Sequence, residues 1–180
     1  KRVLVIGQLE NDVSIKHGAD KVKTNAELLA LACHENPEAQ IIYKAPIHGA
    51  MNKNPDNDKL EQLLKTCLVI NAELPNSALF DNVDHVYDIA SVSGFEALLR
   101  GIKVTTLGCP FYSGWGLTDD RQPNSRRSRK LTIDQLVAGA YLLYLRYYHP
   151  QTGRACTPEQ AVDAFITEHN QALKKKAEQD

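Results

Sequence analysis

The stretch HVYDIASVSGFEALLRGIKVTTL, from His85 to Leu107, decides the fold class. It begins with a strand pattern at 85–87, continues with a helical pattern at 94–100 and ends in a second β-branched run at 104–107. Gly101 follows the helical pattern, where helices commonly end in a left-handed residue. A strand, a helix and a strand in this order form a βαβ unit, which predicts two parallel strands.

The same alternation precedes this unit. Short apolar strand patterns and helical patterns take turns, with strands at 3–6, 41–43 and 68–70 and helices at 25–33, 58–65 and 77–80. Thr24 is the expected N-cap of the helix at 25–33. The order predicts a Rossmann-like α/β fold, in which helices cover both faces of a parallel sheet. Ligands bind beyond the carboxyl ends of such strands. This rule selects the turns after Ile6, Tyr43, Tyr87 and Leu107.

The pattern changes after the fifth expected strand. No periodicity survives across 111–130, which predicts a long loop of the kind that is usually functional or mobile. An apolar helix is expected at 133–146, and a last helix begins with Pro158 at its first position. We therefore expect a Rossmann-like domain over 1–130, followed over 131–180 by C-terminal helices that pack on or link to a second half.

The composition excludes several classes of protein. The chain has 180 residues and a formal net charge of -1, which argues against a general nucleic-acid binder. No run of 18 apolar residues predicts a membrane-spanning helix, and no signal peptide is indicated. The direct start of a core strand after Lys1 suggests a fragment of a longer chain. The scattered histidines and the absence of a CxxC pair predict neither a metal site nor a disulfide framework, so reduced cytosolic thiols are expected.

Ser91, Ser93, Gly94 and Glu96 follow one predicted strand and open the next helix. Hydroxyls and free backbone N–H groups at a helix start attract phosphate, and a glycine there lets a ligand approach the backbone. Glu96 could accept hydrogen bonds from ribose hydroxyls. The alternative is a plain capping box, in which Ser93 caps the helix and Glu96 reciprocates three residues later.

Two other turns carry polar residues at the same edge of the sheet. Gln8 and Asp12 follow the first strand, and Lys44 and His48 follow the second. The first pair could hydrogen-bond a polar ligand, and the second could meet a phosphate or a sugar carboxylate. Ordinary polar surface loops are the alternative for both turns. The first turn is not a GxGxxG loop, so a nicotinamide cofactor is not indicated.

Aromatic residues alternate with glycines after the fifth expected strand. Tyr112, Gly114, Trp115 and Gly116 could pack rings on a sugar face while the glycines make room. A buried hydrophobic plug with turn glycines is the alternative. The basic run at 126–130 could contact an anionic sugar, phosphate or lipid, or could be a solvated charge run.

Taken together, three strings resemble the bacterial capsule polysaccharide biosynthesis and export family. They are SGFEALLRG (Ser93–Gly101), FYSGWGLTDDR (Phe111–Arg121) and LTIDQLVAGA (Leu131–Ala140). The opening GQLENDVSI (Gly7–Ile15) and the closing HPQTGRACTPEQA (His149–Ala161) are also similar, so the resemblance covers nearly the whole chain. Its members include β-Kdo transferases, which build the oligo-Kdo linker on the lipid anchor of Gram-negative capsules.

The resemblance implies one half of a two-Rossmann (GT-B type) glycosyltransferase, with this chain as its C-terminal, donor-binding half. The donor would be CMP-β-Kdo and the acceptor a Kdo-linked phosphatidylglycerol-type lipid. The reaction would retain configuration through an enzyme nucleophile, which lies in the other half. The chain alone is therefore expected to be inactive. No metal and no cofactor are expected. The implied location is cytoplasmic, peripheral to the inner membrane, beside the capsule assembly and export machinery.

The resemblance also implies roles for individual residues. Gln8 and Asp12 match the first polar turn of the family, and Lys44 matches the lysine that precedes its His-Pro motif. The nucleotide-binding turn is matched by Ser91, Ser93, Gly94 and Glu96. Arg121 closes the loop string and is expected, with Tyr112, Gly114, Trp115 and Gly116, as a possible contact to the sugar or its loop.

The turn after the second strand departs from the family pattern. The family has Lys, one residue and then His-Pro, whereas this chain reads Lys44-Ala-Pro46-Ile-His48. A histidine at the CMP phosphate would stabilise the leaving group. Either His48 takes that place through a shifted loop, or the module is impaired.

Three functions remain open from the sequence. The first is the retaining Kdo transferase module, and the second is a non-catalytic binding or scaffold module in capsule assembly, which the altered turn favours. The third is a nucleotide-sugar epimerase of the same architecture, for which the aromatic loop gives no support.

Overall fold

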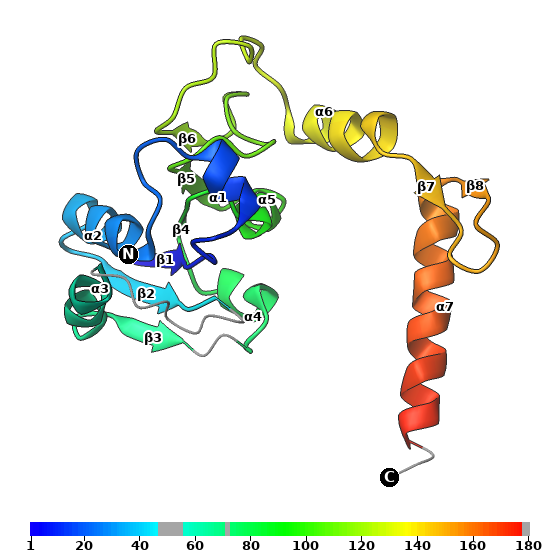
Figure 1. Ribbon diagram of the computed structural model, residues 1–180, viewed down its shortest axis with the longest axis horizontal. Helices are drawn as coiled ribbons and strands as arrows, with labels where there is room; N and C mark the ends of the chain where they lie inside the picture. Colours follow the sequence, from blue (N-terminus) through cyan, green and yellow to red (C-terminus); the bar gives the residue numbers. More distant parts are fainter. Residues whose placement is uncertain (47–55, 71–72, 178–180) are drawn as a thin grey trace. The chain divides into compact units, whose positions relative to one another are not determined.

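The computed structural model describes residues 1–46, 56–70 and 73–177 (Figure 1). The chain divides into two compact units, Lys1–Ile133 and Asp134–Asp180. The domain boundary expected after residue 130 lies a few residues before this division. Each unit is described by itself.

The first unit contains a six-stranded sheet in the order β3-β2-β1-β4-β5-β6. Its strands are β1 (Arg2–Ile6), β2 (Gln40–Lys44), β3 (Leu68–Ile70), β4 (His85–Asp88), β5 (Lys103–Thr106) and β6 (Asp119–Asp120). Every pairing is parallel, as the alternation of strands and helices predicts. The predicted α/β class is confirmed. The strand order reverses between β1 and β4, which is the topological switch point where such sheets bind ligands.

The strand β6 corrects the prediction of an unbroken loop over 111–130. It pairs with β5 through Thr105 opposite Asp119 and Thr106 opposite Asp120. Two aspartates carry no apolar alternation, so no sequence pattern marks this strand.

The helices of the first unit are α1 (Val13–Gly18), α2 (Asn25–Glu35), α3 (Asp56–Leu64), α4 (Asn76–Phe80) and α5 (Val92–Leu98). Helices α2 and α3 lie on one side of the sheet, and α4 and α5 lie on the other (Figure 1). Thr24 caps α2 as predicted, and Glu27 completes a capping box with it. Helix α1 was not predicted, because six residues are too short for a clear helical period.

The core explains which side chains reach which face of the sheet. Val3, Val5 and Tyr87 belong to the buried cluster that α2 covers. Successive residues of a strand point to opposite faces. Lys44 and Asp88, which each follow a cluster residue by one position, therefore point to the face that carries α4 and α5.

The second unit consists of α6 (Ile133–Val137), the π-helix η1 (Ala138–Tyr144), the antiparallel pair β7 (Tyr147–Tyr148) and β8 (Ala155–Cys156), and α7 (Pro158–Ala177). Pro158 begins α7 as predicted. No helix within the described residues is both long and apolar enough to cross a membrane.

The prediction of a single helix over 133–146 is wrong in two respects, which are the type of helix and the residue at which it ends. It changes to π-helical geometry at Ala138 and ends at Leu145, whose backbone is extended (φ -73°, ψ 150°). The Tyr147 hydroxyl donates a 2.8 Å hydrogen bond to the carbonyl of Tyr141. Apolar residues on every side of this segment hide both the change of winding and the end of the helix. Many of them are exposed in this unit, such as Leu143 (77%) and Tyr144 (82%).

Candidate functional site

Side chains from three elements form a hydrogen-bonded chain beyond the carboxyl edge of the sheet. Lys44 ends β2, Asn76 begins α4 and Ser93 lies in the first turn of α5. The Lys44 ammonium donates to Asn76 Oδ1 at 2.6 Å, and Asn76 Nδ2 donates to Ser93 Oγ at 2.6 Å. We call these two hydrogen bonds and their three side chains the Lys44 chain. Since β1 lies between β2 and β4, the Lys44 chain connects the elements on either side of β1. The sequence predicted two of its three residues.

Lys44 is a buried cation with a carboxylate nearby. The residue is 4% exposed. Burial lowers the pKa of its ammonium, and the negative charge of Glu96 acts in the opposite direction on that pKa. Glu96 Oε2 lies 3.4 Å from Asn76 Nδ2. The predicted proximity of Lys44, Ser93 and Glu96 is therefore present in the structure, with Asn76 at its centre.

A pocket of about 510 Å³ opens beside these residues. Small-molecule sites typically measure about 300–1,000 Å³. The lining residues are Lys44, Glu73, Leu74, Pro75, Asn76, Ser77, Glu96 and Arg100. Arg100 stacks its guanidinium carbon 5.1 Å from the centroid of Phe80 and donates to the Glu96 carbonyl at 3.0 Å. The pocket thus combines cationic side chains with carboxylates that can accept hydrogen bonds from hydroxyl groups.

The polar residues after β1 are used inside the protein. Gln8 Oε1 accepts from the backbone N–H of Ala90 at 3.2 Å, and Gln8 Nε2 donates to Ser14 Oγ at 2.6 Å. Asp12 caps α1 by accepting from the Ser14 backbone at 2.8 Å, a bond that lowers the pKa of its carboxyl. Gln8 therefore ties the turn after β1 to the turn after β4 across the switch point. In this structure the two residues predicted to contact a ligand, Gln8 and Asp12, form hydrogen bonds within the protein.

Ser91, and not Ser93, caps α5. Ser91 Oγ accepts from the Ser93 backbone N–H at 3.2 Å. The capping box with Ser93 as the cap, which was the alternative from the sequence, is therefore wrong. Because Ser91 takes the capping role, the side chains of Ser93 and Glu96 are available to the Lys44 chain.

Gly94 is required by packing inside the protein. A Cβ at this position would lie 2.3 Å from Asp88 Oδ2 and 2.3 Å from Tyr112 Oη. Contacts that short do not occur between real atoms, so no larger residue fits without a shift of β4 or of the loop after β5. This packing accounts for the glycine by itself, and the expectation that Gly94 makes room for a ligand stays a prediction.

Asp88 and Tyr112 form a buried pair under α5. Both are 0% exposed, and the Tyr112 hydroxyl lies 2.6 Å from Asp88 Oδ2 and 2.6 Å from the Ser91 carbonyl. Burial raises the pKa of Asp88 to about 7. One phenolic proton cannot satisfy two acceptors fully, so a protonated Asp88 that donates to Tyr112 satisfies both contacts.

The burial of Tyr112 corrects the prediction that it contacts a sugar. Its ring packs edge-on against Phe111, with centroids 5.3 Å apart, and lies 6.2 Å from Phe95. For this residue the structure shows the alternative from the sequence, a buried aromatic plug.

The rest of the aromatic loop is held by Arg127. Gly114 and Gly116 have positive φ values of 79° and 77°, which explains the glycines as turn residues. Arg127 donates to the Ser113 carbonyl at 2.9 Å, and its guanidinium carbon lies 5.7 Å from the Trp115 ring centroid. This member of the basic run therefore stabilises its own loop. Trp115 is half-buried, and its contact with a sugar stays a prediction.

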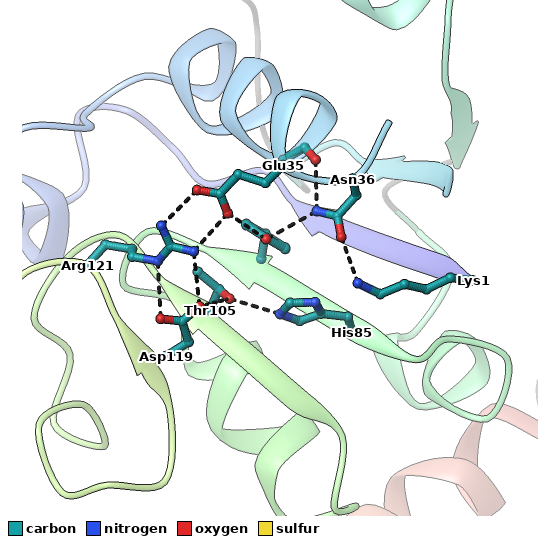
Figure 2. Close-up of polar contacts among 9 residues, drawn as sticks. Lys1, Glu35, Asn36, His85, Thr105, Asp119 and Arg121 are labelled. Carbon is teal, nitrogen blue, oxygen red and sulfur yellow. Dashed lines mark hydrogen bonds and ion pairs between the residues drawn. The ribbon is translucent and has the colours of Figure 1, made fainter. Parts of the chain in front are cut away.

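Arg121, a predicted sugar contact, lies in a polar network on the α2 face of the sheet (Figure 2). Its guanidinium binds Glu35 through two bonds of 2.7 and 2.8 Å and Asp119 at 3.0 Å. The network continues through Thr105, which lies 2.9 Å from His85 Nε2. The prediction is corrected, because pairing of β6 with β5 brings Arg121 to Glu35 rather than to the pocket.

Asn76 is the site residue that sequence reasoning missed. It follows Pro75, which has an extended backbone (φ -64°, ψ 143°), at the start of α4. A Pro-Asn pair after the third strand was the available signal, but the selected turns did not include this one. His48 lies outside the described residues. Within the described ranges, no group of three or more His, Cys, Asp or Glu side chains could hold a metal ion.

Comparison with known proteins gives concordant matches. The family described as capsule polysaccharide biosynthesis protein matches residues 1–154. The lipopolysaccharide-processing protein LpsZ of Rhizobium meliloti is 43% identical over 99% of this chain, and the capsule polysaccharide modification protein LipA of Neisseria meningitidis serogroup A is 39% identical over 93%. The chain spans 40% and 24% of the lengths of these two relatives.

Two solved structures from Thermosulfurimonas dismutans are also similar. The KpsC β-Kdo 2,7 transferase has a TM-score of 0.79 and 39% identity, and the KpsC β-Kdo 2,4 transferase has a TM-score of 0.75 and 34% identity. They match 94% and 92% of this chain, which covers 55% and 52% of theirs.

Proposed function

The chain belongs to the capsule polysaccharide biosynthesis protein family, and from that premise we propose that it forms the CMP-binding half of a retaining β-Kdo transferase. The structural neighbours are Kdo transferases, which supports glycosyl transfer as the reaction class. The donor in this proposal is CMP-β-Kdo. The chain covers about half of each neighbouring structure. In this proposal a second Rossmann-like half, outside this chain, completes the GT-B cleft.

The Lys44 chain beside the pocket is the observation that carries the proposal. A phosphate needs positive charge and hydrogen-bond donors, which Lys44 and Ser93 supply from two elements that flank the switch point. Glu96 lines the same pocket and can accept hydrogen bonds from the ribose hydroxyls. The residues thus match the two polar parts of a nucleotide.

The same geometry suggests how the site assists transfer. When the bond between Kdo and CMP breaks, negative charge develops on the phosphate of the leaving CMP. The Lys44 ammonium, which is 4% exposed and lines the pocket, stabilises that charge electrostatically. Retention requires two displacements, in which a carboxylate nucleophile of the other half first takes the Kdo and an acceptor hydroxyl then receives it.

The wider role follows from the same proposal. The acceptor is a Kdo-linked phosphatidylglycerol-type lipid, which places the protein at the cytoplasmic face of the inner membrane beside the capsule assembly and export machinery. The donor-binding half needs neither a metal nor a cofactor, since Lys44 and the hydroxyl donors bind the phosphate.

Replacement of Lys44 by Met in the protein at its full natural length tests this function. We expect the variant to lose affinity for CMP by about tenfold to a hundredfold, because a charge-assisted contact is removed. Transfer of Kdo from CMP-β-Kdo to a Kdo-primed lipid analogue should fall at least as much. Calorimetric titration with CMP and a product assay measure the two effects.

Lys103→Met is the matched control. Lys103 is exposed at the start of β5, at the opposite edge of the sheet, and its replacement should change neither CMP affinity nor transfer. A folded wild-type protein that gives no heat with millimolar CMP would count against the proposal.

A non-catalytic binding module is the second candidate. The altered order Lys44-Ala-Pro46-Ile-His48 favours it, because the family's histidine is displaced from its usual place after the lysine. This candidate predicts CMP binding without transfer in the protein at full length. Transfer that depends on a carboxylate in the other half would exclude it.

A further inference from the structure

We propose that Asn76 is a positioning residue that sets the direction of the hydrogen bonds in the Lys44 chain, so that the Ser93 hydroxyl donates its proton to an anionic oxygen of the ligand. The inference rests on the proposed function in one respect, which is that this oxygen belongs to a nucleotide phosphate. Asn76 binds nothing by itself in this proposal. It acts through its two neighbours.

The direction of the chain follows from the chemistry of Lys44. A protonated lysine has three N–H donors and no acceptor. The atom of Asn76 at 2.6 Å from the Lys44 ammonium must therefore be the carbonyl oxygen. The amide nitrogen then faces the other way and donates to Ser93 Oγ at 2.6 Å. Lysine fixes the orientation of the amide, and the amide fixes the role of the serine.

The consequence appears at Ser93. A hydroxyl has one proton to donate and accepts through its lone pairs. In the hydrogen bond that joins Ser93 Oγ to Asn76, the hydroxyl oxygen is the acceptor. The proton of Ser93 is therefore directed away from Asn76. Ser93 is half-buried at the start of α5, and its partner Asn76 and the neighbouring Glu96 line the pocket.

The ligand group that fits this site is an oxygen with negative charge. Lys44 supplies a buried positive charge, of which the bond to Asn76 uses one N–H. Ser93 supplies a directed O–H. A phosphate oxygen accepts from both, whereas an amine or another donor would face the Ser93 proton and the Lys44 charge.

The substitution Asn76→Asp separates this role from a merely structural one. Aspartate has the shape of asparagine but accepts hydrogen bonds on both oxygens. The new carboxylate would neutralise Lys44 and draw the Ser93 proton toward itself, so both groups would be lost to the ligand. A structural role predicts the reverse order of Asn76→Asp and Asn76→Ala. The new carboxylate would gain an ion pair with the Lys44 ammonium, and this attraction offsets its repulsion from Glu96, whose Oε2 lies 3.4 Å from Asn76 Nδ2.

The experiment compares Asn76→Asp, Asn76→Ala and Ser93→Ala in the protein at full length. Calorimetry measures the affinity for CMP, for inorganic phosphate and for cytidine, which lacks the phosphate, and thermal unfolding reports folding. We expect CMP affinity to fall in the order wild type, Asn76→Ala, Asn76→Asp, with a loss of about tenfold to a hundredfold for the aspartate variant. Cytidine affinity should change less than about twofold, within the precision of such comparisons.

A double-mutant cycle gives the sharpest readout. Ser93→Ala alone should weaken CMP binding by about tenfold, and in the Asn76→Asp background it should have little further effect, because the serine proton is already lost. Asn76→Asp protein that is folded and binds CMP like the wild type would overturn the inference. So would a full effect of Ser93→Ala in the Asn76→Asp background.

Failure of the proposed function gives a different result. If wild-type protein binds inorganic phosphate but not CMP, and Asn76→Asp abolishes phosphate binding, the inference stands and the nucleotide is excluded. If folded wild-type protein binds neither probe, both the inference and the proposed function are overturned.

Discussion

Two polar networks flank the same sheet, and each holds a basic side chain. On the α2 face, Arg121 is paired with the carboxylates of Glu35 and Asp119 (Figure 2). At the carboxyl edge, Lys44 donates to the neutral amide of Asn76, and it makes no ion pair with any described residue. The charge of Arg121 is therefore compensated by carboxylates within the protein, whereas in our proposal the charge of Lys44 is compensated by the ligand. The partner of a basic residue therefore tells more about its role than the residue itself.

The largest expected effect comes from the packing beneath the carboxyl edge. Gly94→Ala would place a Cβ 2.3 Å from both Asp88 Oδ2 and Tyr112 Oη. Overpacking typically costs about 1–3 kcal/mol, and we expect a value at the upper end because both neighbours are buried and hydrogen-bonded. The free energy of unfolding, measured by denaturant titration, should fall accordingly.

Gly139→Ala is the control for this change. No described atom lies within 4 Å of a Cβ at Gly139, and its backbone φ is not positive. It should leave the free energy of unfolding unchanged or slightly raised. Equal destabilisation by the two substitutions would show that Gly94 is not held by Asp88 and Tyr112.

A pH-dependent effect is expected at Asp88. Its folded-state pKa is raised to about 7 from 3.8, so the folded protein retains this proton while the unfolded chain releases it. Wild-type stability should fall as pH rises from about 4 to about 7, by at most about 1.4 kcal/mol per pH unit, and the loss should level off above that range. Asp88→Asn keeps a donor for the Tyr112 oxygen, as protonated Asp88 does, but cannot ionise.

The measurement is the difference in unfolding free energy between Asp88→Asn and wild type across this pH range. The variant should gain relative to wild type as pH rises. A difference that stays constant from about pH 4 to about pH 8 would mean that Asp88 ionises at its ordinary pKa in the folded protein.

The smallest effect is expected in the network of Figure 2. Arg121→Met should cost about 1 kcal/mol of unfolding free energy, because the bidentate pair with Glu35 is partly exposed, at 37% and 21% of the two side chains. CMP affinity should remain within about twofold of wild type. A large loss of CMP affinity in a stable Arg121→Met protein would erase the distinction between the two networks.

Part of this picture could be predicted from the sequence. Alternating strands and helices predicted the parallel sheet, and the carboxyl-edge rule selected Lys44 and the Ser93–Glu96 turn. Those predictions succeed because they depend on local periodicity and on the geometry shared by all parallel sheets. Both predictions concern only which backbone turns meet at the carboxyl edge of the sheet.

The misses concern side chains whose partners lie far away in the sequence. Arg121 seemed free for a ligand because β6, which brings it to Glu35, leaves no mark in the sequence pattern. Tyr112 seemed available to a sugar because its burial depends on Asp88, in another strand. Asn76 was overlooked because its role exists only between Lys44 and Ser93. Propensity and period do not encode such contacts.

Hydrogen–deuterium exchange of the full-length protein, with and without CMP, tests the central claim most directly. The account predicts slower exchange on CMP binding at the end of β2 and at the starts of α4 and α5. It predicts no change at the end of α2 or in β6. Protection around Glu35 and Arg121, or unchanged exchange at the carboxyl edge in protein saturated with CMP, would contradict it.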